Sequence, residues 1–250
     1  MVAKLTDVAE LAGVSPTTVS RVINNKGYLS EKTKQKVHEA MKTLGYKPNN
    51  LARGLQGKSP QLIGLIFPNI SNIFYSELIE YLEIELFKHG YKTIICNSQN
   101  DPAKEREYIE MLEANQVDGI ISKSHNLGIA DYERVRAPIV AFDRNLAPNV
   151  SIVSSDNFEG GKLAAKTLQK NGCQNTIMIT GNDNTDSPTE LRALGFSFQN
   201  PNGKIFKIPN NLSTIRREME IKSTIINHKP DGIFVSDDLT AILTMKIAHQ

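Results

Sequence analysis

The sequence has few cysteines and no long apolar run. Its two cysteines, Cys96 and Cys173, are 77 residues apart and have neither metal-ligand nor CxxC spacing, which predicts reduced, partly buried thiols. No stretch is apolar over the length of a membrane span, and the N-terminus lacks the apolar core of a secretory signal. These absences predict a cytoplasmic protein that does not associate with a membrane.

Motifs typical of common catalytic sites are also missing. No GxGxxG follows the first expected strand, and the sequence contains no GxxxxGK(S/T), GxSxG or HExxH. The five histidines are scattered without the spacing of metal ligands. We therefore expect a protein that is not an enzyme and that uses no cofactor and no metal.

The charge of the chain is nearly balanced overall but unevenly distributed. The 250 residues carry a formal net charge of +2, yet residues 1–58 hold ten basic and four acidic side chains. The N-terminal part is therefore +6 and the other 192 residues are −4. A basic head on an acidic body suggests that only the head meets a polyanion, although a basic surface is often merely a solvated face.

The segment LTDVAELAGVSPTTVSRVI (5–23) has two short apolar-periodic runs on either side of a tight turn. Ser15 followed by Pro16 predicts a helix start, because serine caps the first turn and proline at the first helical position loses no hydrogen bond. Two threonines and Arg21 lie away from the apolar face of this second helix. The pattern predicts a helix-turn-helix that offers these polar side chains to a DNA major groove; an ordinary helix pair is the alternative for the turn alone.

A third helix and a linker follow. Ser30 caps a helix that ends near Gly45, before Pro48, so residues 1–47 are expected to form a compact three-helix unit. Residues 49–60, NNLARGLQGKSP, have a weak helical signal and are too few for a stable isolated helix, which needs roughly 12–15 residues. We expect this linker to be mobile until a partner orders it.

From residue 61 onward, apolar strands alternate with amphipathic helices. The expected strands are 62–67, 91–97, 118–122, 138–142, 151–155, 176–180, 204–208 and 232–235. The expected helices are 74–88, 102–115, 129–136, 158–171, 189–197, 213–227 and 239–249. This order predicts an α/β body of two doubly wound parallel-sheet lobes, with about four to five strands each, that divide near residues 155–160.

Several segments of the sequence are distinctive. They are LTDVAELAGVSPTTVSRVINN, LGYKPN, LARGL, IGLIFPNISNIFYSEL, AFDR, SSDNFEGG, LRALGF and DGIFVSDDLTA. Together they make essentially the whole chain resemble the lactose/galactose repressor family of bacterial regulators. The resemblance implies a DNA-binding head, a hinge and a body built like periplasmic sugar-binding proteins, which acts as a homodimer on a near-palindromic double-stranded DNA operator.

By this resemblance, the domains are a helix-turn-helix head (1–47), a hinge (48–60) and two effector-binding lobes (61–157 and 158–250). Family members usually continue past the position of Gln250, and the stretch before the strand at 204–208 is short for the family. We therefore expect the second lobe to be incomplete.

The resemblance assigns DNA contacts position by position. The residues of the second helix that it implies are Ser15, Pro16, Thr17, Thr18, Ser20 and Arg21. Pro16, Thr17 and Arg21 take base-facing positions, whereas Thr18 and Ser20 bond phosphate or cap the helix. An arginine can fork onto guanine O6 and N7, which is worth roughly 1–3 kcal/mol of discrimination; a phosphate contact or a surface ion pair is the alternative.

The hinge residues implied by the resemblance are Ala52 and Leu55. Leu55 takes the place of a leucine that wedges between base pairs in the minor groove. Such a wedge unstacks a base step at a cost of a few kcal/mol, which bending and extra contacts offset. The alternative is that Leu55 only packs on the body.

In doubly wound sheets, ligands bind beyond the carboxyl ends of the strands, so the residues that follow each strand are the candidates. Those that match effector-cleft positions of the family are Asn69, Phe74, Asp143, Arg192 and Asp237. Carboxylates, a guanidinium fork and an aromatic ring suit a polyhydroxylated ligand. The alternatives are helix caps for the two aspartates, a surface ion pair for Arg192, the core for Phe74 and a turn for Asn69.

We expect a repressor of a carbohydrate-utilisation operon that a small sugar effector controls. The sequence around AFDRN and SSDN is most similar to that of the ribose and sucrose regulators of Gram-positive bacteria. We therefore expect ribose, sucrose or a related sugar as the effector. Two alternatives stay open. One is a catabolite-control-type regulator with a phosphoprotein or purine corepressor, and the other is a transport-type sugar-binding protein.

Overall fold

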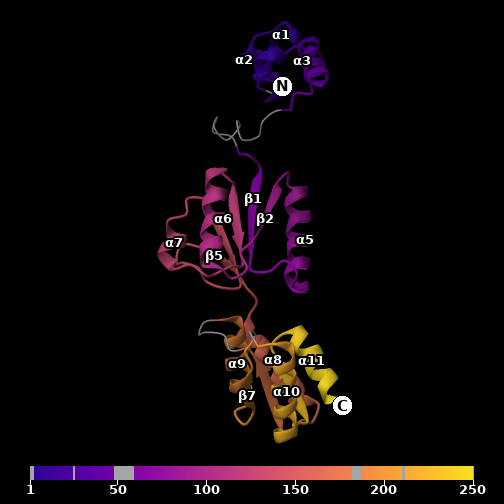
Figure 1. The fold of residues 1–250 in the computed structure, drawn as a ribbon, viewed down its shortest axis with the longest axis vertical. Helices are drawn as coiled ribbons and strands as arrows, with labels where there is room; N and C mark the ends of the chain where they lie inside the picture. The colour runs from indigo at the N-terminus through magenta and orange to yellow at the C-terminus, as the bar shows by residue number, and fades with distance from the viewer. Residues whose placement is uncertain (1–2, 25, 48–58, 182–186, 210–211, 250) are drawn as a thin grey trace. The chain divides into compact units, whose positions relative to one another are not determined.

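The computed structural model describes residues 3–24, 26–47, 59–181, 187–209 and 212–249 (Figure 1). The head consists of three helices, α1 (Leu5–Ala12), α2 (Pro16–Ile23) and α3 (Glu31–Leu44). Their apolar faces enclose a small core of Val8, Ala9, Ala12, Val19, Val22, Val37 and Ala40. The three helices begin and end close to where the capping and turn residues predict.

Two left-handed glycines define the ends of the first and third helices. Gly13 ends α1 with φ 65°, and Gly45 ends α3 with φ 61°. Glycine adopts this conformation with the least steric penalty, which is consistent with its place in both turns. The predicted hinge residues Ala52 and Leu55 lie outside the described residues.

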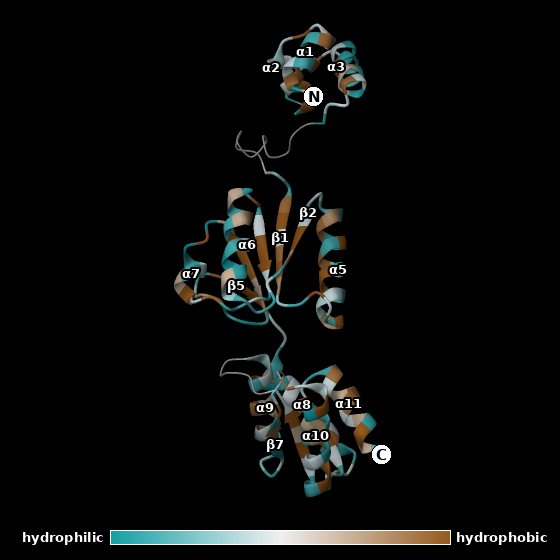
Figure 2. Cartoon of the chain, viewed as in Figure 1, coloured by the Kyte–Doolittle hydropathy of each residue, from teal (hydrophilic) through white to brown (hydrophobic). Residues whose placement is uncertain are grey.

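The first lobe of the body is built on a five-stranded parallel sheet with the order β2-β1-β3-β4-β5. Its strands are β1 (Leu62–Phe67), β2 (Lys92–Asn97), β3 (Gly119–Ser122), β4 (Ile139–Phe142) and β5 (Ser151–Val153). Its helices are α5 (Ile73–Lys88), α6 (Pro102–Ala114) and α7 (Ile129–Glu133). Figure 2 shows how the apolar colour concentrates on these strands.

Alternate residues of β1 meet helices on opposite faces of the first sheet. Leu65 and Phe67 are fully buried and pack with Ile79 of α5. Gly64 faces the other way and lies against Leu112 of α6, where a Cβ would clash with the leucine side chain. Since successive strand residues point to opposite faces, α5 and α6 cover the two faces of the sheet, as a doubly wound lobe requires.

The second lobe contains a three-stranded parallel sheet with the order β7-β6-β8. Its strands are β6 (Thr176–Thr180), β7 (Lys204–Lys207) and β8 (Gly232–Val235). Its helices are α8 (Asn157–Lys170), α9 (Pro188–Gln199), α10 (Thr214–His228) and α11 (Asp238–Ala248). Among the described residues this sheet has three strands, fewer than the four to five that the alternation predicts.

The central strand of the second sheet is buried on both faces. Ile177 and Ile179 pack with Ile221 of α10 and Ile247 of α11. Met178 points the other way and packs with a separate cluster from α8 and α9, Ala165, Ala193 and Phe196. This strand therefore forms a continuous apolar run, as expected for a central parallel strand.

Helices α8 and α9 cross at two glycines. A Cβ on Gly161 would clash with the backbone of Arg192, and a Cβ on Gly195 would clash with the backbone of Phe158. The two backbones approach this closely because neither glycine has a side chain. The crossing fixes α9, and therefore Arg192, against the start of α8.

Candidate functional site

The second helix of the head presents an exposed polar face. Its first-turn cap is Ser15, whose Oγ accepts a hydrogen bond of 3.1 Å from the backbone N–H of Thr18 and lies 2.9 Å from the Thr18 hydroxyl. Pro16, Thr17 and Arg21 are exposed, whereas Val19 and Val22 are buried in the head core. All three of the side chains predicted to face the bases are therefore exposed.

Two of the predicted phosphate contacts are partly engaged within the head. The hydroxyl of Thr18 meets Ser15 in the helix cap. Ser20 is half-buried, and its carbonyl and Oγ accept hydrogen bonds of 2.8 and 3.3 Å from the Asn24 amide. Thr18 therefore meets the N-cap residue Ser15 and Ser20 meets the C-cap residue Asn24, while Thr17 and Arg21 are exposed.

In the body, a cluster of charged and polar side chains surrounds Asp143, which directly follows β4. Its carboxylate lies 3.4 Å from the Lys123 ammonium and accepts a hydrogen bond of 3.3 Å from the Asn157 amide. The Asp143 side chain is 14% exposed and that of Lys123 is 8% exposed. Asp143 has φ 68°, in the left-handed region that non-glycine residues seldom occupy outside functional sites and turns.

Lys123 directly follows β3 and is the buried cation of this cluster. Burial lowers its pKa, the charge of Asp143 opposes that shift, and the positive charges of Arg144 and Arg192 lower the pKa further. The ammonium also lies 5.5 Å from the ring centre of Phe142, a cation–π distance. Lysine is rarely this buried unless it has a partner, and its partner is the predicted ligand residue Asp143.

Arg192 joins the same cluster through Asn157. Its Nε donates a 2.8 Å hydrogen bond to Asn157 Oδ1, and its Nη1 donates a 2.5 Å hydrogen bond to the carbonyl of Ser236, which follows β8. Asn157 is thus hydrogen-bonded to both Asp143 and Arg192. The structure brings these two predicted site residues together through a third residue that sequence reasoning missed.

Of the remaining three predicted ligand residues, Asn69 and Asp237 follow strand ends and Phe74 lies in the first turn of α5, and each has local partners. Asn69 accepts hydrogen bonds of 2.8 and 2.7 Å from the backbone and hydroxyl of Ser71 in a turn. Asp237 caps α11 by accepting a 2.9 Å hydrogen bond from the Thr240 N–H. Phe74 is 51% exposed, so it is not a core residue, and its ring lies 6.1 Å from that of Phe142.

Three buried polar atoms at strand carboxyl ends have no hydrogen-bond partner within the described parts of the chain. They are Asn97 Oδ1 at the end of β2, Thr180 Oγ1 at the end of β6 and Ser236 Oγ after β8. Buried polar atoms are nearly always paired, so unpaired ones need a cause. Their position, at the edge where doubly wound folds bind ligands, makes them further candidates for ligand contact.

A buried carboxylate braces the loop that carries Lys123. Glu105 of α6 is fully buried, and its two oxygens accept hydrogen bonds from the Tyr132 hydroxyl (2.5 Å), the Asn126 amide side chain (2.7 Å) and the Asn126 backbone (3.1 Å). Burial, together with this carboxylate, raises the pKa of Tyr132. The brace ties α6 and α7 to the loop after β3 and so fixes where Lys123 stands.

Sequence reasoning missed Lys123, Asn157, Ser236 and Glu105. A signal for Lys123 exists, because a charged side chain directly follows an apolar strand at the ligand-binding edge. Asn157 follows Asp156, which resembles an ordinary helix cap, and Glu105 sits in a helix with many exposed charges. No local pattern separates these two from solvated polar residues.

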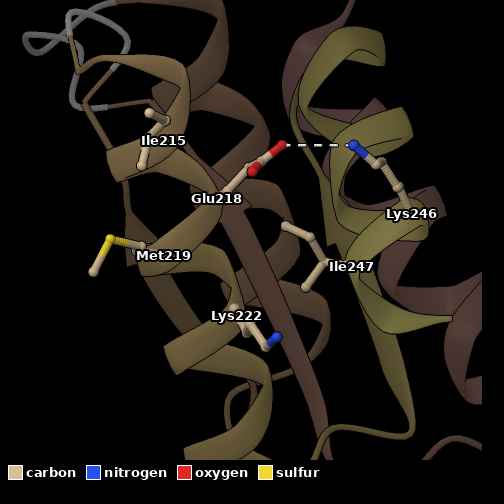
Figure 3. A pocket seen from close by; sticks show the side chains of 6 residues that line it. All are labelled: Ile215, Glu218, Met219, Lys222, Lys246 and Ile247. Carbon is tan, nitrogen blue, oxygen red and sulfur yellow. Dashed lines mark ion pairs between the residues drawn. The ribbon is translucent and has the colours of Figure 1, made fainter. Parts of the chain in front are cut away.

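A separate pocket lies between α10 and α11 (Figure 3). It is lined by Ile215, Glu218, Met219, Lys222, Lys246 and Ile247. Glu218 and Lys246 form an exposed ion pair of 3.8 Å across it. None of the predicted site residues lines this pocket.

Within the described residues, no helix is both long and apolar enough to cross a membrane.

Comparisons with known families cover most of the chain. Residues 4–49 match the family described as bacterial regulatory proteins, lacI family. Residues 60–248 match the family described as periplasmic binding proteins and sugar binding domain of LacI family. The two matches correspond to the helical head and to the α/β body.

Several curated proteins are similar along the whole chain. The sucrose operon repressor of Streptococcus mutans serotype c is 77% identical over 250 residues, which cover 100% of this chain and 78% of that protein. The ribose operon repressor of Halalkalibacterium halodurans is 37% identical over 251 residues, which cover 97% and 74% of the two chains.

Solved structures share the fold. The lac repressor dimer bound to operator and the anti-inducer ONPF has a TM-score of 0.82 at 23% identity, covering 100% of this chain and 78% of that chain. A periplasmic binding protein/LacI transcriptional regulator from Alkaliphilus metalliredigens, complexed with D-xylulofuranose, has a TM-score of 0.65 at 29% identity, covering 76% and 72%. With both family matches, a helix-turn-helix head and a sugar-binding-protein-like body, the chain belongs to the lacI family of bacterial regulatory proteins.

Proposed function

We propose that the protein represses a sucrose-utilisation operon by binding a near-palindromic operator as a homodimer, and that a sugar effector bound in the body releases it. The observation that carries this proposal is the 77% identity, over all 250 residues, with a protein named sucrose operon repressor. A regulator of this kind performs no catalysis and acts where the operator is, in the cytoplasm.

In this proposal, residues 1–47 read the operator, 48–60 form the hinge, and 61–157 and 158–250 are the two effector-binding lobes. The exposed positions of Thr17 and Arg21 support a major-groove role for α2. Ala52 and Leu55 are proposed to reach the minor groove from the hinge.

For the effector, we propose contacts from the cluster around Asp143 and Arg192, together with Asn69, Phe74 and Asp237. Two features support this assignment. The cluster lies at strand carboxyl ends, and an exposed aromatic ring, Phe74, lies beside it next to Phe142. A carboxylate, a guanidinium and an aromatic ring are the groups that bind the hydroxyls and apolar face of a sugar.

For the effector to release DNA, it must bind the released state more tightly than the operator-bound state. The test is to select a duplex from a random library with the protein and then follow its release by fluorescence anisotropy. Sucrose-type sugars should release the duplex, while ribose and an unrelated sugar serve as comparisons. A duplex of scrambled sequence is the control for DNA binding that does not depend on sequence.

Absence of any salt-sensitive preference for a two-fold-symmetric duplex would contradict the proposal. Release by a purine, or only by an added phosphoprotein, would favour the alternative corepressor mechanisms. The basic head and its helix-turn-helix argue against a transport-type sugar-binding protein, because such a protein does not bind DNA.

A further inference from the structure

The outward face of helix α9 in the second lobe is apolar although it is exposed. Leu191, Leu194 and Phe198 are spaced so that they share one face of the helix, and they are 41%, 52% and 68% exposed. Another face of α9 packs into the lobe through the buried side chains of Ala193 and Phe196. A helix needs one apolar face to pack against its own domain, so the fold of the described lobe does not account for the second stripe.

The ring of Phe198, the most exposed member of this stripe, is held in place by α8. Its centre lies 5.7 Å from that of Phe158. The Lys162 ammonium lies 5.5 Å from the ring centre of Phe198 and 5.7 Å from that of Phe158, and Glu159 pairs with it at 2.5 Å. A side chain that is ordered before binding loses less entropy when a partner covers it, and aromatic side chains are frequent anchors of protein interfaces.

The border of the stripe on α8 carries an excess of positive charge. Lys166 lies one turn beyond Lys162 and is exposed, and no carboxylate among the described residues forms an ion pair with it. On the other border, Glu190 of α9 pairs with Lys207 at 2.8 Å. The end of α8 favours the next cation, Lys170, through the helix dipole, but Lys166 has no such local role. An apolar stripe with a basic border is complementary to an apolar face with an acidic border.

The backbone of this surface favours a helical partner. The backbone groups of α8 and α9 are hydrogen-bonded within the helices, so the surface has no open strand edge with which an extended segment could pair. An amphipathic helix brings its own backbone groups already paired and offers apolar side chains at the same spacing. Leu191 and Phe198 are seven residues apart, about 10 Å along the helix axis, which matches about two turns of a partner helix.

Charge argues against a second copy of the chain as the partner. Two-fold pairing of this surface with itself would place the border at Lys166 against an equally basic border, which is unfavourable. Contact with a different face of a second copy would repeat from one copy to the next and build open assemblies unless the rotation closed a ring.

We propose that the outer surface of α8 and α9 is a docking site for an acidic amphipathic helix of a different protein. Leu194 and Phe198 are its apolar anchors, and Lys166 is the charge that selects an acidic partner. This inference goes beyond the proposed function, because the docking site requires neither an operator nor an effector.

The test follows the binding of labelled synthetic helical peptides, each of about four turns, to the whole chain by fluorescence anisotropy. One peptide has leucines at the spacing of the stripe with glutamates on both sides. The second has lysines in place of the glutamates, and the third has alanines in place of the leucines. The acidic leucine peptide should bind about tenfold or more tightly than either of the others, and an excess of scrambled duplex DNA should not displace it.

Two variants test the assigned residues. Phe198→Ala should weaken binding of the acidic peptide about tenfold, and Lys166→Glu should weaken it at least fivefold. Lys166→Glu should also bind the basic peptide more tightly than the parent does, a gain that a loss of folding cannot produce. The matched controls are Ile226→Ala and Lys222→Glu, at exposed positions of α10, which should leave binding unchanged. Comparing melting temperatures establishes that each variant is folded.

Equal binding of the acidic and basic peptides would overturn the proposal. Displacement of the peptide by DNA would overturn it as well, by showing that the surface binds a polyanion rather than a helix. Sedimentation velocity provides a further check: assemblies larger than a dimer that disappear in Phe198→Ala would make the stripe a contact between copies of this chain and so contradict the proposal. Binding of the operator and of the sugar is measured separately, so a failure here leaves the proposed function intact.

Discussion

The Nε of Arg192 donates a 2.8 Å hydrogen bond to Oδ1 of Asn157, the first residue of α8. The same Asn157 donates from its amide nitrogen to Asp143, at 3.3 Å. One buried amide therefore uses its acceptor toward the arginine and its donor toward the aspartate. An amide is suited to this position because it holds a cation and an anion at once without adding charge.

Asn157→Ala should weaken effector binding about tenfold while leaving operator affinity without effector nearly unchanged. The substitution removes the link that orients both Asp143 and Arg192, so the cost falls on ligand affinity, of the order of 1–2 kcal/mol. Titration of the effector against the free protein and against operator-bound protein measures both quantities. The matched control is Asn149→Ala, an exposed asparagine outside the cluster; equal effects from both variants would contradict the prediction.

Arg21→Ala should relax the base preference of the head as well as weaken binding. If the guanidinium forks onto a guanine, its loss removes roughly 1–3 kcal/mol of discrimination at one base pair in each half-site. Competition between the selected duplex and single-base variants measures this. Lys42→Ala, an exposed charge on α3, serves as the control. A uniform loss across all duplexes would mean that Arg21 contacts phosphate instead.

Gly161→Ala should destabilise the second lobe by about 1–3 kcal/mol, because the new methyl group clashes with the backbone of α9 and the helices must separate. The matched control is Gly160→Ala, the same substitution at the neighbouring position, where a Cβ meets nothing within 4 Å. That change should instead stabilise α8 by roughly 0.5–1 kcal/mol. Urea unfolding measures the change in the free energy of unfolding for each variant. A change of the same sign in both variants would refute the close approach of α8 and α9 at Gly161.

Cys96 should make stability fall in alkaline solution. Burial raises the pKa of this thiol from 9.0 to about 11, so the folded protein keeps its proton while the unfolded chain loses it. The unfolded state therefore gains free energy of ionisation as pH rises above 9, and the free energy of unfolding falls by up to roughly 2 kcal/mol toward pH 11.

The comparison that isolates this effect is with Cys96→Ala. The variant should be less stable than the parent at pH 7 because it loses buried contacts, and the gap should shrink as pH rises from 8 to 10.5. Titration of Tyr132, whose pKa is also raised, affects both proteins equally and cancels. A gap that stays constant with pH would show that the thiol does not titrate between the two states as described.

Most of the fold could be predicted because its elements depend on local physics. The cap Ser15, the proline at Pro16 and the left-handed Gly45 act within a few residues, and the helices begin and end there. The strand Leu62–Phe67 is apolar on both faces and was predictable as a central parallel strand. The helix expected at 129–136 is shorter, Ile129–Glu133, because the residues before Pro138 leave the helix.

The candidate site was only partly predictable. Asp143 and Arg192 carry a family resemblance and a strand-end position, and the structure places both in one cluster. Lys123, Asn157 and Glu105 act through partners that are between 14 and 35 residues away in sequence. Such partners are set by how strands β3 and β4 pair and by where α8 begins, and no short-range pattern encodes them.

The left-handed backbone of Asp143 narrows the ways in which this regulator could acquire a new effector. Only glycine, asparagine and aspartate occupy that conformation at little cost, so most exchanges at this position would carry a folding penalty before any new ligand were recognised. Lys123, on the neighbouring strand end, is under no such backbone restriction. Changes of specificity among relatives, and in laboratory evolution of biosensors, should therefore accumulate at position 123 and its surroundings well before they reach position 143.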